Sequence, residues 1–343
     1  MIDLPAISII IPTYNVEKYI KDCLDSVFRQ TFRDFEVIVS DDCSTDRTVE
    51  IVENYAQRFG QIQLIRRSTN SGGGGIPRNA FITHATGKYI VFLDSDDMLV
   101  QNALQILFDA AEKFQSDMVS AESYFRFKED DFDPVTRNIN VKIYSQIPSD
   151  KLVKVQTLEP NDIADRFRKY FNYELTGFVW NKIYRRDFLL ENRIEFHDIP
   201  MRHDSLFDLE CISSAKNYVR IPQIVNLYRV RRESISHHPD PKKLLRKWIS
   251  DLLRLLEETN KFLNRHEFFQ RNPQLKYDIL DDFAQSTLQQ ISKLYRKIDL
   301  REIESIFREE FCKYPSATFV FQMFNIVQTY RSEISMLLES KES

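Results

Sequence analysis

Short apolar segments alternate with helical patterns throughout the first 120 residues of the chain. The apolar segments are rich in β-branched residues and are typical of buried strands; they span 6–11, 35–39, 62–65 and 88–93, with another from Met118. Between them, apolar residues recur at helical spacing over 16–29, 46–58, 77–86 and 101–114. Repeated strand–helix units predict an α/β fold, with a mostly parallel sheet covered by helices on both faces.

Polar clusters follow three of these predicted strands at the point where each strand ends. They are Pro12-Thr13-Tyr14-Asn15, Asp41-Asp42 and Asp94-Ser95-Asp96-Asp97. In open α/β sheets, ligands bind outside the carboxyl ends of the strands. We therefore expect the three clusters to meet at one rim of the sheet and to form a binding site there.

The acidic segment 94–97 places three carboxylates within four residues at the end of a buried strand. A helix cap would explain one of them, and Asp97 suits that role. The mutual repulsion of three is better explained by a hard divalent cation such as Mg²⁺ or Mn²⁺. Asp41-Asp42 is less specific, because it leads into Cys43-Ser44-Thr45-Asp46, which also has the composition of a cap. Its carboxylates could equally accept a hydrogen bond from a nucleobase.

Glycine is rare in this chain, yet four of its seven glycines are consecutive, at 72–75. A run of this kind is often a surface linker. Here it precedes a predicted helix with Arg78 in the first turn, a combination that also suits an anionic ligand. The chain lacks the G-x-x-x-x-G-K-[ST] and G-x-G-x-x-G patterns, which excludes a P-loop and a dinucleotide-binding domain.

Composition narrows the function further. The chain has 343 residues, a formal net charge of -4 and 43% hydrophobic residues, typical of a globular protein with no general attraction to nucleic acid. Its four cysteines are far apart, which favours a reducing compartment. No signal sequence and no run of about 18 apolar residues is present, so we expect a cytoplasmic protein, peripheral at most to the inner face of the plasma membrane.

Several motifs occur in the order found in family 2 glycosyltransferases of the GT-A fold, which the chain strongly resembles. They are Ser8-Ile-Ile-Ile-Pro-Thr-Tyr-Asn15, Gln30-Thr-Phe, Asp41-Asp-Cys-Ser-Thr-Asp46, Pro77-Arg-Asn79 and Phe92-Leu-Asp-Ser-Asp-Asp97. A weaker resemblance continues in Trp180–Arg186, His203–Phe207 and Tyr228–Ser236, and fades after residue 238. It implies an α/β GT-A fold, with a mixed, mostly parallel central sheet and a C-terminal helical appendage.

The resemblance also implies roles for individual residues. The nucleotide-sugar-binding set would be Pro12, Thr13, Tyr14, Asn15, Asp42, Arg78, Asp94 and Ser95. Asp96 would bind Mn²⁺ or Mg²⁺, and His237 would be a further ligand unless it lies in a solvated loop. Asp204 matches the general base of the family; this chain has His203 where many members have Glu, and Cys43 where glycine is commoner.

We therefore expect an inverting, metal-dependent glycosyltransferase. It would move a hexose or N-acetylhexosamine from a UDP-sugar to a cell-surface glycan or a teichoic-acid-type polymer. Arg78 or a basic residue among Lys182–Arg186 would neutralise the departing nucleoside diphosphate. The alternatives are a non-catalytic nucleotide-sugar-binding module of an assembly complex, and a nucleotidyltransferase.

The domain organisation predicted from the pattern is a catalytic domain at 1–240 and a helical region at 241–343. Within the first, 1–127 would bind the nucleotide sugar and 128–240 the acceptor. The helical region has leucine stripes that favour packing against the catalytic domain. Two other roles stay open: membrane or acceptor contact through Lys242, Lys243, Arg246, Lys247 and Trp248, and self-association through Phe319, Phe321 and Phe324.

Overall fold

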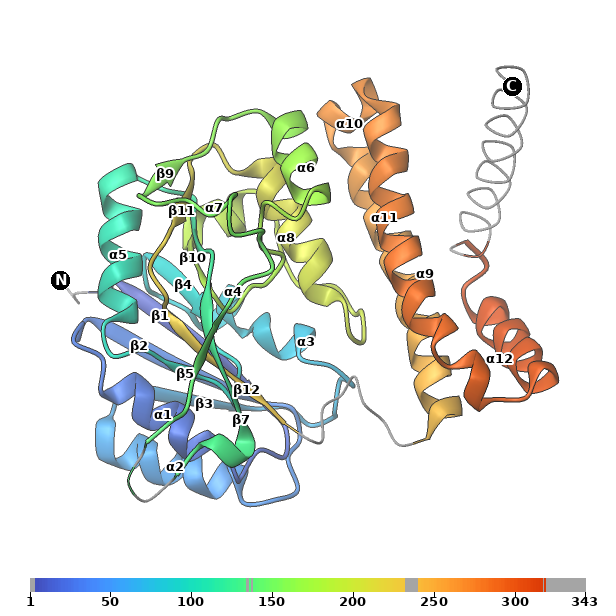
Figure 1. The fold of residues 1–343 in the computed structure, drawn as a ribbon. Helices are drawn as coiled ribbons and strands as arrows, with labels where there is room; N and C mark the ends of the chain where they lie inside the picture. The colour runs from blue at the N-terminus through green and yellow to red at the C-terminus, as the bar shows by residue number, and fades with distance from the viewer. Residues whose placement is uncertain (1–3, 134–135, 137, 232–239, 317, 319–343) are drawn as a thin grey trace. The chain divides into compact units, whose positions relative to one another are not determined.

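The computed structural model describes residues 4–133, 136, 138–231, 240–316 and 318. These residues pack as two units. The sheet unit contains the described residues up to Asp198 and those from His203 to 231. The helical unit contains Ile199–Arg202 and the described residues from 240 onward. Figure 1 shows the elements of each unit.

The strands described in the sheet unit form two sheets, of eight and four strands. The larger sheet has the order β3-β2-β1-β4-β10-β6-β11-β9. Its strands are β1 (Ile7–Thr13), β2 (Phe35–Asp41), β3 (Ile62–Arg66), β4 (Tyr89–Phe92), β6 (Met118–Ala121), β9 (Thr157–Leu158), β10 (Lys182–Arg185) and β11 (Tyr218–Ile221). Strands β3, β2, β1 and β4 run parallel, while β10 lies antiparallel between β4 and β6. The predicted mixed sheet is therefore confirmed.

Helices cover both faces of this sheet. Side chains of a strand alternate between its faces, and here the side chains on both faces are apolar and need to be covered. On β1, Ile7, Ile9 and Ile11 join one apolar core with α1 (Ile20–Phe28), α2 (Thr48–Phe59) and α5 (Ala103–Phe114). Ile10 joins the opposite core with α4 (Ala80–His84), α7 (Arg186–Glu191) and α8 (His203–Ser214). Two further helices are α3 (Gly75–Arg78) and α6 (Ile163–Phe171), so the single helix predicted over 77–86 is wrong: the structure has α3 and α4 there.

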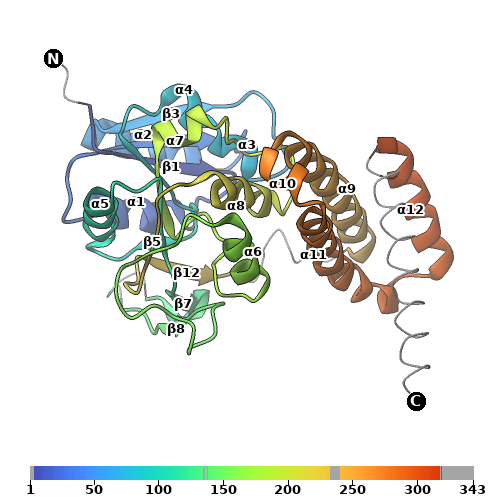
Figure 2. The ribbon, with the colours of Figure 1, turned by 90° about the horizontal axis from the view of Figure 1, so that it is seen from above.

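The smaller sheet has the order β5-β12-β7-β8. Its strands are β5 (Met98–Leu99), β12 (Asn226–Val230), β7 (Tyr124–Lys128) and β8 (Lys142–Tyr144), with a 3₁₀ turn at Glu129–Asp131. Figure 2 shows β12, β7 and β8 beside one another. The prediction that Asp97 caps a helix is wrong. Asp97 is buried before β5 and accepts hydrogen bonds from Asn226 Nδ2 (3.2 Å) and Arg229 N (2.8 Å), because β12 needs a partner for these groups.

The helical unit consists of α9 (Pro241–Arg265), α10 (Glu267–Arg271), α11 (Pro273–Ser292) and α12 (Leu300–Lys313), with a 3₁₀ turn at Tyr295–Lys297. Asp240 caps α9 by accepting from Lys242 N, and Pro241 occupies the first turn. The leucine stripe of α9 is buried against α10, α11 and α12 of the same unit, so packing of the stripe against the catalytic domain stays a prediction. No helix among the described residues is long and apolar enough to span a membrane.

Two cations of the basic cluster at the start of α9 form ion pairs within the helical unit. Lys242 Nζ lies 2.6 Å from a carboxylate oxygen of Glu302, and Arg246 Nη1 lies 2.5 Å from one of Glu309. These pairs with α12 reduce the charge that the cluster can offer to an anionic surface. The phenylalanines suggested for self-association, at 319, 321 and 324, lie outside the described residues.

Candidate active site

The ends of β1 and β2 are joined by hydrogen bonds, so the first two polar clusters meet as predicted. Parallel pairing sets Thr13 opposite Asp41. Thr13 Oγ1 donates to Asp41 Oδ1 over 3.2 Å, and Asp42 N donates to Thr13 O over 2.8 Å. Pro12 is buried at the same strand end. These contacts fix the backbone at the rim of the sheet.

Asn15 and Tyr14 follow the strand end in a tight turn. Asn15 has a positive φ of 49°, a conformation that asparagine tolerates better than most residues. Its Oδ1 accepts from Thr45 N over 2.8 Å, which holds the loop after β2 against this turn. Tyr14 is 49% exposed, so its ring is accessible to a ligand.

Asp42 fastens the glycine-rich loop. The buried carboxylate accepts from Arg67 Nε over 2.9 Å at Oδ1, and from Ser71 N and Ser71 Oγ over 2.8 and 2.7 Å at Oδ2. Both oxygens thus have protein donors. The contact of Asp42 with a nucleobase stays a prediction; what the structure adds is a role in positioning the loop before Arg78.

The glycine-rich loop is packed closely against the side chains of Arg78 and His203, which a plain linker would not be. A Cβ on Gly74 would lie 2.6 Å from Arg78 Nη1, and a Cβ on Gly75 would lie 2.9 Å from His203 Cγ. Only glycine leaves room for both groups. Arg78 itself is 4% exposed, with its guanidinium over the ring of Phe196.

Each of the first two carboxylates of the acidic segment is paired with an arginine. Asp94 Oδ1 accepts from Arg78 Nη2, and Asp96 Oδ2 lies 2.6 Å from Arg231 Nε. Burial raises the pKa of Asp96, although the charge of Arg231 opposes this. Ser95 is buried between them. Arg231 belongs to the Tyr-Arg-Val-Arg motif noticed in the sequence, but no sequence signal pointed to its pairing with Asp96.

Asp204 lies in the first turn of α8 and is connected to this arrangement through His203. His203 Nε2 lies 3.0 Å from Arg78 Nη1 and 3.1 Å from Asp204 Oδ1. Burial by itself raises the pKa of Asp204, but the neighbouring His203 and the guanidinium of Arg78 outweigh the effect of burial, so this pKa is lowered. An unbroken series of contacts therefore joins Asp94, Arg78, His203 and Asp204, although Arg78 and His203 are 125 residues apart in the chain.

The expectation of a donor-facing cation among Lys182–Arg186 is wrong for Lys182. Its ammonium group is fully buried, pairs with Asp208 and donates to Thr176 O over 2.7 Å. Arg185 Nη2 donates to Asp117 over 2.8 Å instead. Both are structural contacts made by β10, whose position between β4 and β6 could not be read from the sequence.

A divalent cation fits the acidic segment only if a ligand outside the chain completes its coordination. Among the described residues, no three His, Cys, Asp or Glu side chains gather as a metal site, and His237 lies outside them. Asp96 nevertheless holds a half-buried carboxylate near Asp94, and this carboxylate already pairs with one cationic group, Arg231. A hard cation bound by one or two carboxylates and by phosphate oxygens satisfies the same demand.

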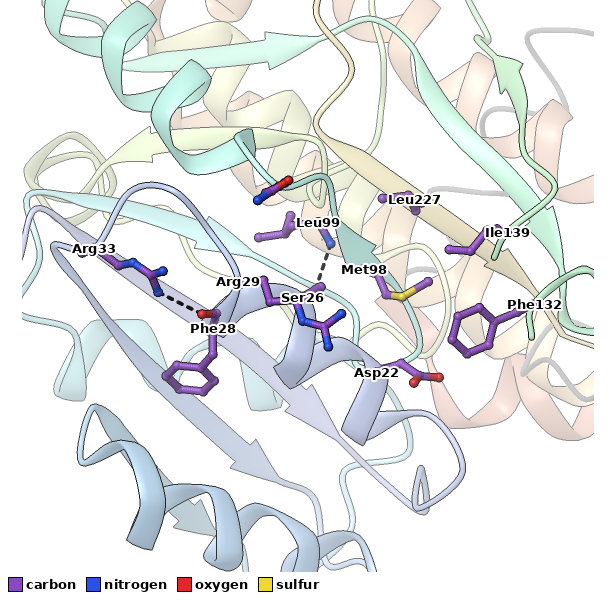
Figure 3. Close-up of a pocket in the computed structure, with 11 residues that line it drawn as sticks. Asp22, Ser26, Phe28, Arg29, Arg33, Met98, Leu99, Phe132, Ile139 and Leu227 are labelled. Atoms are coloured by element: carbon purple, nitrogen blue, oxygen red, sulfur yellow. Dashed lines mark hydrogen bonds between the residues drawn. The ribbon is translucent and has the colours of Figure 1, made fainter. Parts of the chain in front are cut away.

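A separate cavity of about 520 Å³ lies between α1, β5 and β12 (Figure 3). It has an apolar wall that includes Met98, Leu99 and Leu227, and a polar side with Asp22 and Arg29. None of the predicted site residues lines it. It is therefore distinct from the site at the strand ends.

Comparison with known proteins identifies the family. The family model described as "Glycosyl transferase family 2" matches residues 8–207. The chain belongs to glycosyl transferase family 2. It is 30% identical over 237 residues to the uncharacterized glycosyltransferase EpsJ of Bacillus subtilis, an alignment that covers 69% of this chain and 64% of EpsJ.

A second relative is the poly(ribitol-phosphate) beta-N-acetylglucosaminyltransferase TarS of Staphylococcus aureus. It is 30% identical over 280 residues, covering 77% of this chain and 44% of TarS. The chain thus spans less than two thirds of either relative. The crystal structure of S. aureus TarS 1–349 with UDP-GlcNAc matches 91% of this chain and 81% of that one, with a TM-score of 0.62 and 24% identity. This likeness confirms the GT-A fold.

Proposed function

We propose that this member of family 2 is an inverting glycosyltransferase, which moves a hexose or N-acetylhexosamine from a UDP-sugar to a hydroxyl group of a cell-surface polymer of the teichoic acid type. One observation carries the proposal. The contacts from Asp94 through Arg78 and His203 to Asp204 join the predicted donor-binding residues and the predicted base in one site. A sugar bound by the donor-binding residues would present its anomeric carbon to an acceptor activated by Asp204.

The donor end of the proposed site combines the residues at the strand ends. Tyr14 offers an exposed ring for a nucleobase, and Asp94 and Ser95 would lie on the ribose side. Arg78, already oriented by Asp94, would face the diphosphate. The same proposed set contains Pro12, Thr13, Asn15 and Asp42. These residues would hold the backbone at the strand ends in the shape that the donor needs.

Asp204 would act as the general base. Its lowered pKa keeps the carboxylate ionised at neutral pH, ready to take a proton. The acceptor hydroxyl would give its proton to Asp204 while its oxygen attacks the anomeric carbon. The bond from that carbon to the diphosphate breaks, and UDP leaves from the opposite face. Direct displacement of this kind inverts the anomeric configuration.

We assign Asp96 as the protein ligand of Mn²⁺ or Mg²⁺, since a desolvated carboxylate with a raised pKa is stabilised by a cation. When bound, the cation would offset the negative charge that grows on the departing diphosphate. Arg78 pairs with Asp94, and Arg231 pairs with Asp96, beside the proposed cation site.

The acceptor class is suggested by TarS, which is named as a poly(ribitol-phosphate) beta-N-acetylglucosaminyltransferase. The crystallised TarS fragment holds UDP-GlcNAc, which supports a UDP-sugar as donor. Both statements concern TarS. For this chain the acceptor class, any peripheral membrane contact and any self-association belong to the proposal.

A donor-hydrolysis screen tests this function. The protein would be incubated with common UDP-, GDP- and CDP-sugars and Mn²⁺, and release of the nucleoside diphosphate measured, then repeated with poly(ribitol phosphate). We expect release from a UDP-sugar, stimulation by the polymer, loss in chelator and recovery on adding Mn²⁺ or Mg²⁺. Activity that persists in chelator would remove the cation from the proposal. Binding of UDP-sugar without turnover would favour a non-catalytic module, and turnover of a sugar phosphate with a nucleoside triphosphate would favour a nucleotidyltransferase.

A further inference from the structure

His203 occupies the space between the guanidinium of Arg78 and the carboxylate of Asp204. The imidazole is 8% exposed, lies against Gly75 and faces the ring of Phe196 at a centroid distance of 5.9 Å. Its Nε2 is 3.0 Å from Arg78 Nη1 and 3.1 Å from Asp204 Oδ1. The ring is thus confined to a position where a single nitrogen meets a cation on one side and an anion on the other.

One ring nitrogen cannot serve both neighbours at once. A guanidinium only donates, so the contact with Arg78 requires Nε2 to act as an acceptor and the proton of the neutral ring to sit on Nδ1. Nε2 then has no proton to donate to Asp204. The geometry agrees with this assignment, since Asp204 Oδ1 is buried and receives no hydrogen bond from the described residues.

We propose that His203 is a positioning residue that gives Arg78 Nη1 a neutral acceptor and thereby keeps this guanidinium from pairing with the base Asp204. The inference rests on the proposed function, because it concerns the availability of the base. Arg78 Nη2 is held by Asp94, which leaves Nη1 to be satisfied by whatever acceptor is nearest. Without the imidazole that acceptor would be Asp204 Oδ1, because this oxygen contacts the same ring nitrogen as Arg78 does.

A direct pair between Arg78 and Asp204 would harm the base in two ways. A charge-assisted hydrogen bond stabilises the ionised carboxylate and weakens its affinity for a proton. It would also turn the carboxylate towards the donor-binding arginine and away from an acceptor. A carboxylate side chain in place of the imidazole could also accept from Arg78. The imidazole does so without placing a second negative charge beside Asp204.

A double-mutant cycle between His203 and Arg78 tests this role. We expect His203→Ala to lower kcat about 10- to 100-fold, within the range that a general base supplies, and to leave the KM for the UDP-sugar within about twofold. In an Arg78→Met background there is no guanidinium to pair with Asp204. The same His203→Ala change should then lower kcat by less than about twofold, a strong departure from additivity.

The conservative variant His203→Gln provides the control. Its side-chain carbonyl can accept from Arg78, so it should restore most of the kcat that His203→Ala loses. If His203→Ala does not fold, Gly75→Ala gives a second route, since the added Cβ would displace the ring. Equal losses of kcat in both Arg78 backgrounds, or no recovery with glutamine, would overturn the inference.

A crystal structure of His203→Ala separates this inference from the proposed function. We expect Arg78 Nη1 to move within hydrogen-bond distance of Asp204 Oδ1. If the wild-type protein transfers no sugar, the proposed function fails, but the position of Arg78 in this variant still decides the inference. An Arg78 that keeps its place, with the two groups still apart, would overturn it.

Discussion

The aspartates of the candidate active site differ in the partners that surround them. Asp42, Asp94 and Asp96 each pair directly with an arginine. Asp97 accepts from an amide and a backbone N–H instead. Among these five, Asp204 alone faces an imidazole, and one of its oxygens is buried without a hydrogen bond from the described residues. Asp204 thus lacks, among the described residues, the direct arginine partner that Asp42, Asp94 and Asp96 each have.

Replacing Asp204 by asparagine removes the proton acceptor and preserves the shape of the side chain. We expect Asp204→Asn to lower kcat by about 10²- to 10⁴-fold, the usual contribution of a general base. The affinity for the UDP-sugar, measured by calorimetry, should stay the same because the donor-side pair of Arg78 and Asp94 is intact. A parallel loss of donor affinity would count against the assignment of Asp204 as the base.

The pH dependence of kcat follows from the lowered pKa of Asp204. The base works in its ionised form, so activity is present above this pKa and is lost as the pH falls through it. Because the pKa is lowered, the midpoint of the loss should lie below the ordinary aspartate value of about 3.9. Arg78→Met removes a charge that lowers the pKa, and should shift the acidic limb of the kcat profile to higher pH. An acidic limb near neutral pH that is unchanged by Arg78→Met would identify a different ionising group.

Helix α8 is held in place by a buried ion pair one turn after Asp204. Asp208 lies four residues further along the helix and pairs with Lys182 of β10, and both side chains are fully buried. Burial raises the pKa of Asp208 to about 6, against the opposing charge of Lys182. The pair fixes the start of α8 relative to the central sheet, so it positions the base without facing the donor.

Breaking this pair should destabilise the protein strongly. Asp208→Ala leaves the ammonium of Lys182 buried without its carboxylate, and we expect the free energy of unfolding to fall by about 3–5 kcal/mol. Replacing both partners, as Lys182→Met with Asp208→Leu, should cost less than the single change. Denaturation with urea measures both.

Glu267→Ala is the matched control for this prediction, because its pair with Arg271 is exposed on α10. An exposed pair contributes little, so its removal should leave the urea midpoint unchanged. Similar midpoints for Asp208→Ala and Glu267→Ala would show that the buried pair does not hold α8.

At the scale of the whole molecule, the chain passes from the sheet unit to the helical unit more than once. The segment Ile199–Arg202 belongs to the helical unit, although the residues on both sides of it belong to the sheet unit. Asp251 of α9 accepts from Met201 N and Arg202 N over 2.7 and 3.0 Å. Arg202 Nη1 donates to Thr287 of α11 over 2.6 Å. These bonds hold Met201 and Arg202 within the helical unit.

Loss of the Asp251 carboxylate should weaken the helical unit. Asp251→Ala leaves two backbone N–H groups without their acceptor, and we expect the free energy of unfolding to fall by about 1–3 kcal/mol. Trp248 lies in the helical unit and Trp180 in the sheet unit. The fluorescence of Trp248 in a Trp180→Phe background therefore reports on the helical unit, and that of Trp180 in a Trp248→Phe background reports on the sheet unit. The loss should be seen at Trp248. Glu304→Ala, at an exposed pair of α12, serves as the control; equal midpoints for the two variants would refute the prediction.

Much of the fold could be predicted because its signals are local. The β-branched runs, the helical spacing and the strand-end clusters each depend on residues that are close in the chain. The predictions that failed needed distant partners. Asp97 follows a strand as a cap would, but its partners come from β12. Lys182 has the positive charge expected of a donor-binding residue, but it is buried and paired with Asp208. Periodicity does not report either partner, since a residue type carries no information on its neighbours in space.

By itself, the sequence determined the family, the α/β architecture and the rim at which its strand-end clusters meet. These follow from short motifs and from periodicity, which the backbone converts into strands, helices and their ends. Only the tertiary structure decided how the charges are shared: which arginine holds Asp94, which holds Asp96, and that His203 stands between Arg78 and Asp204. The reason is physical, because the strength of such contacts depends on distances between groups that the chain brings together only on folding.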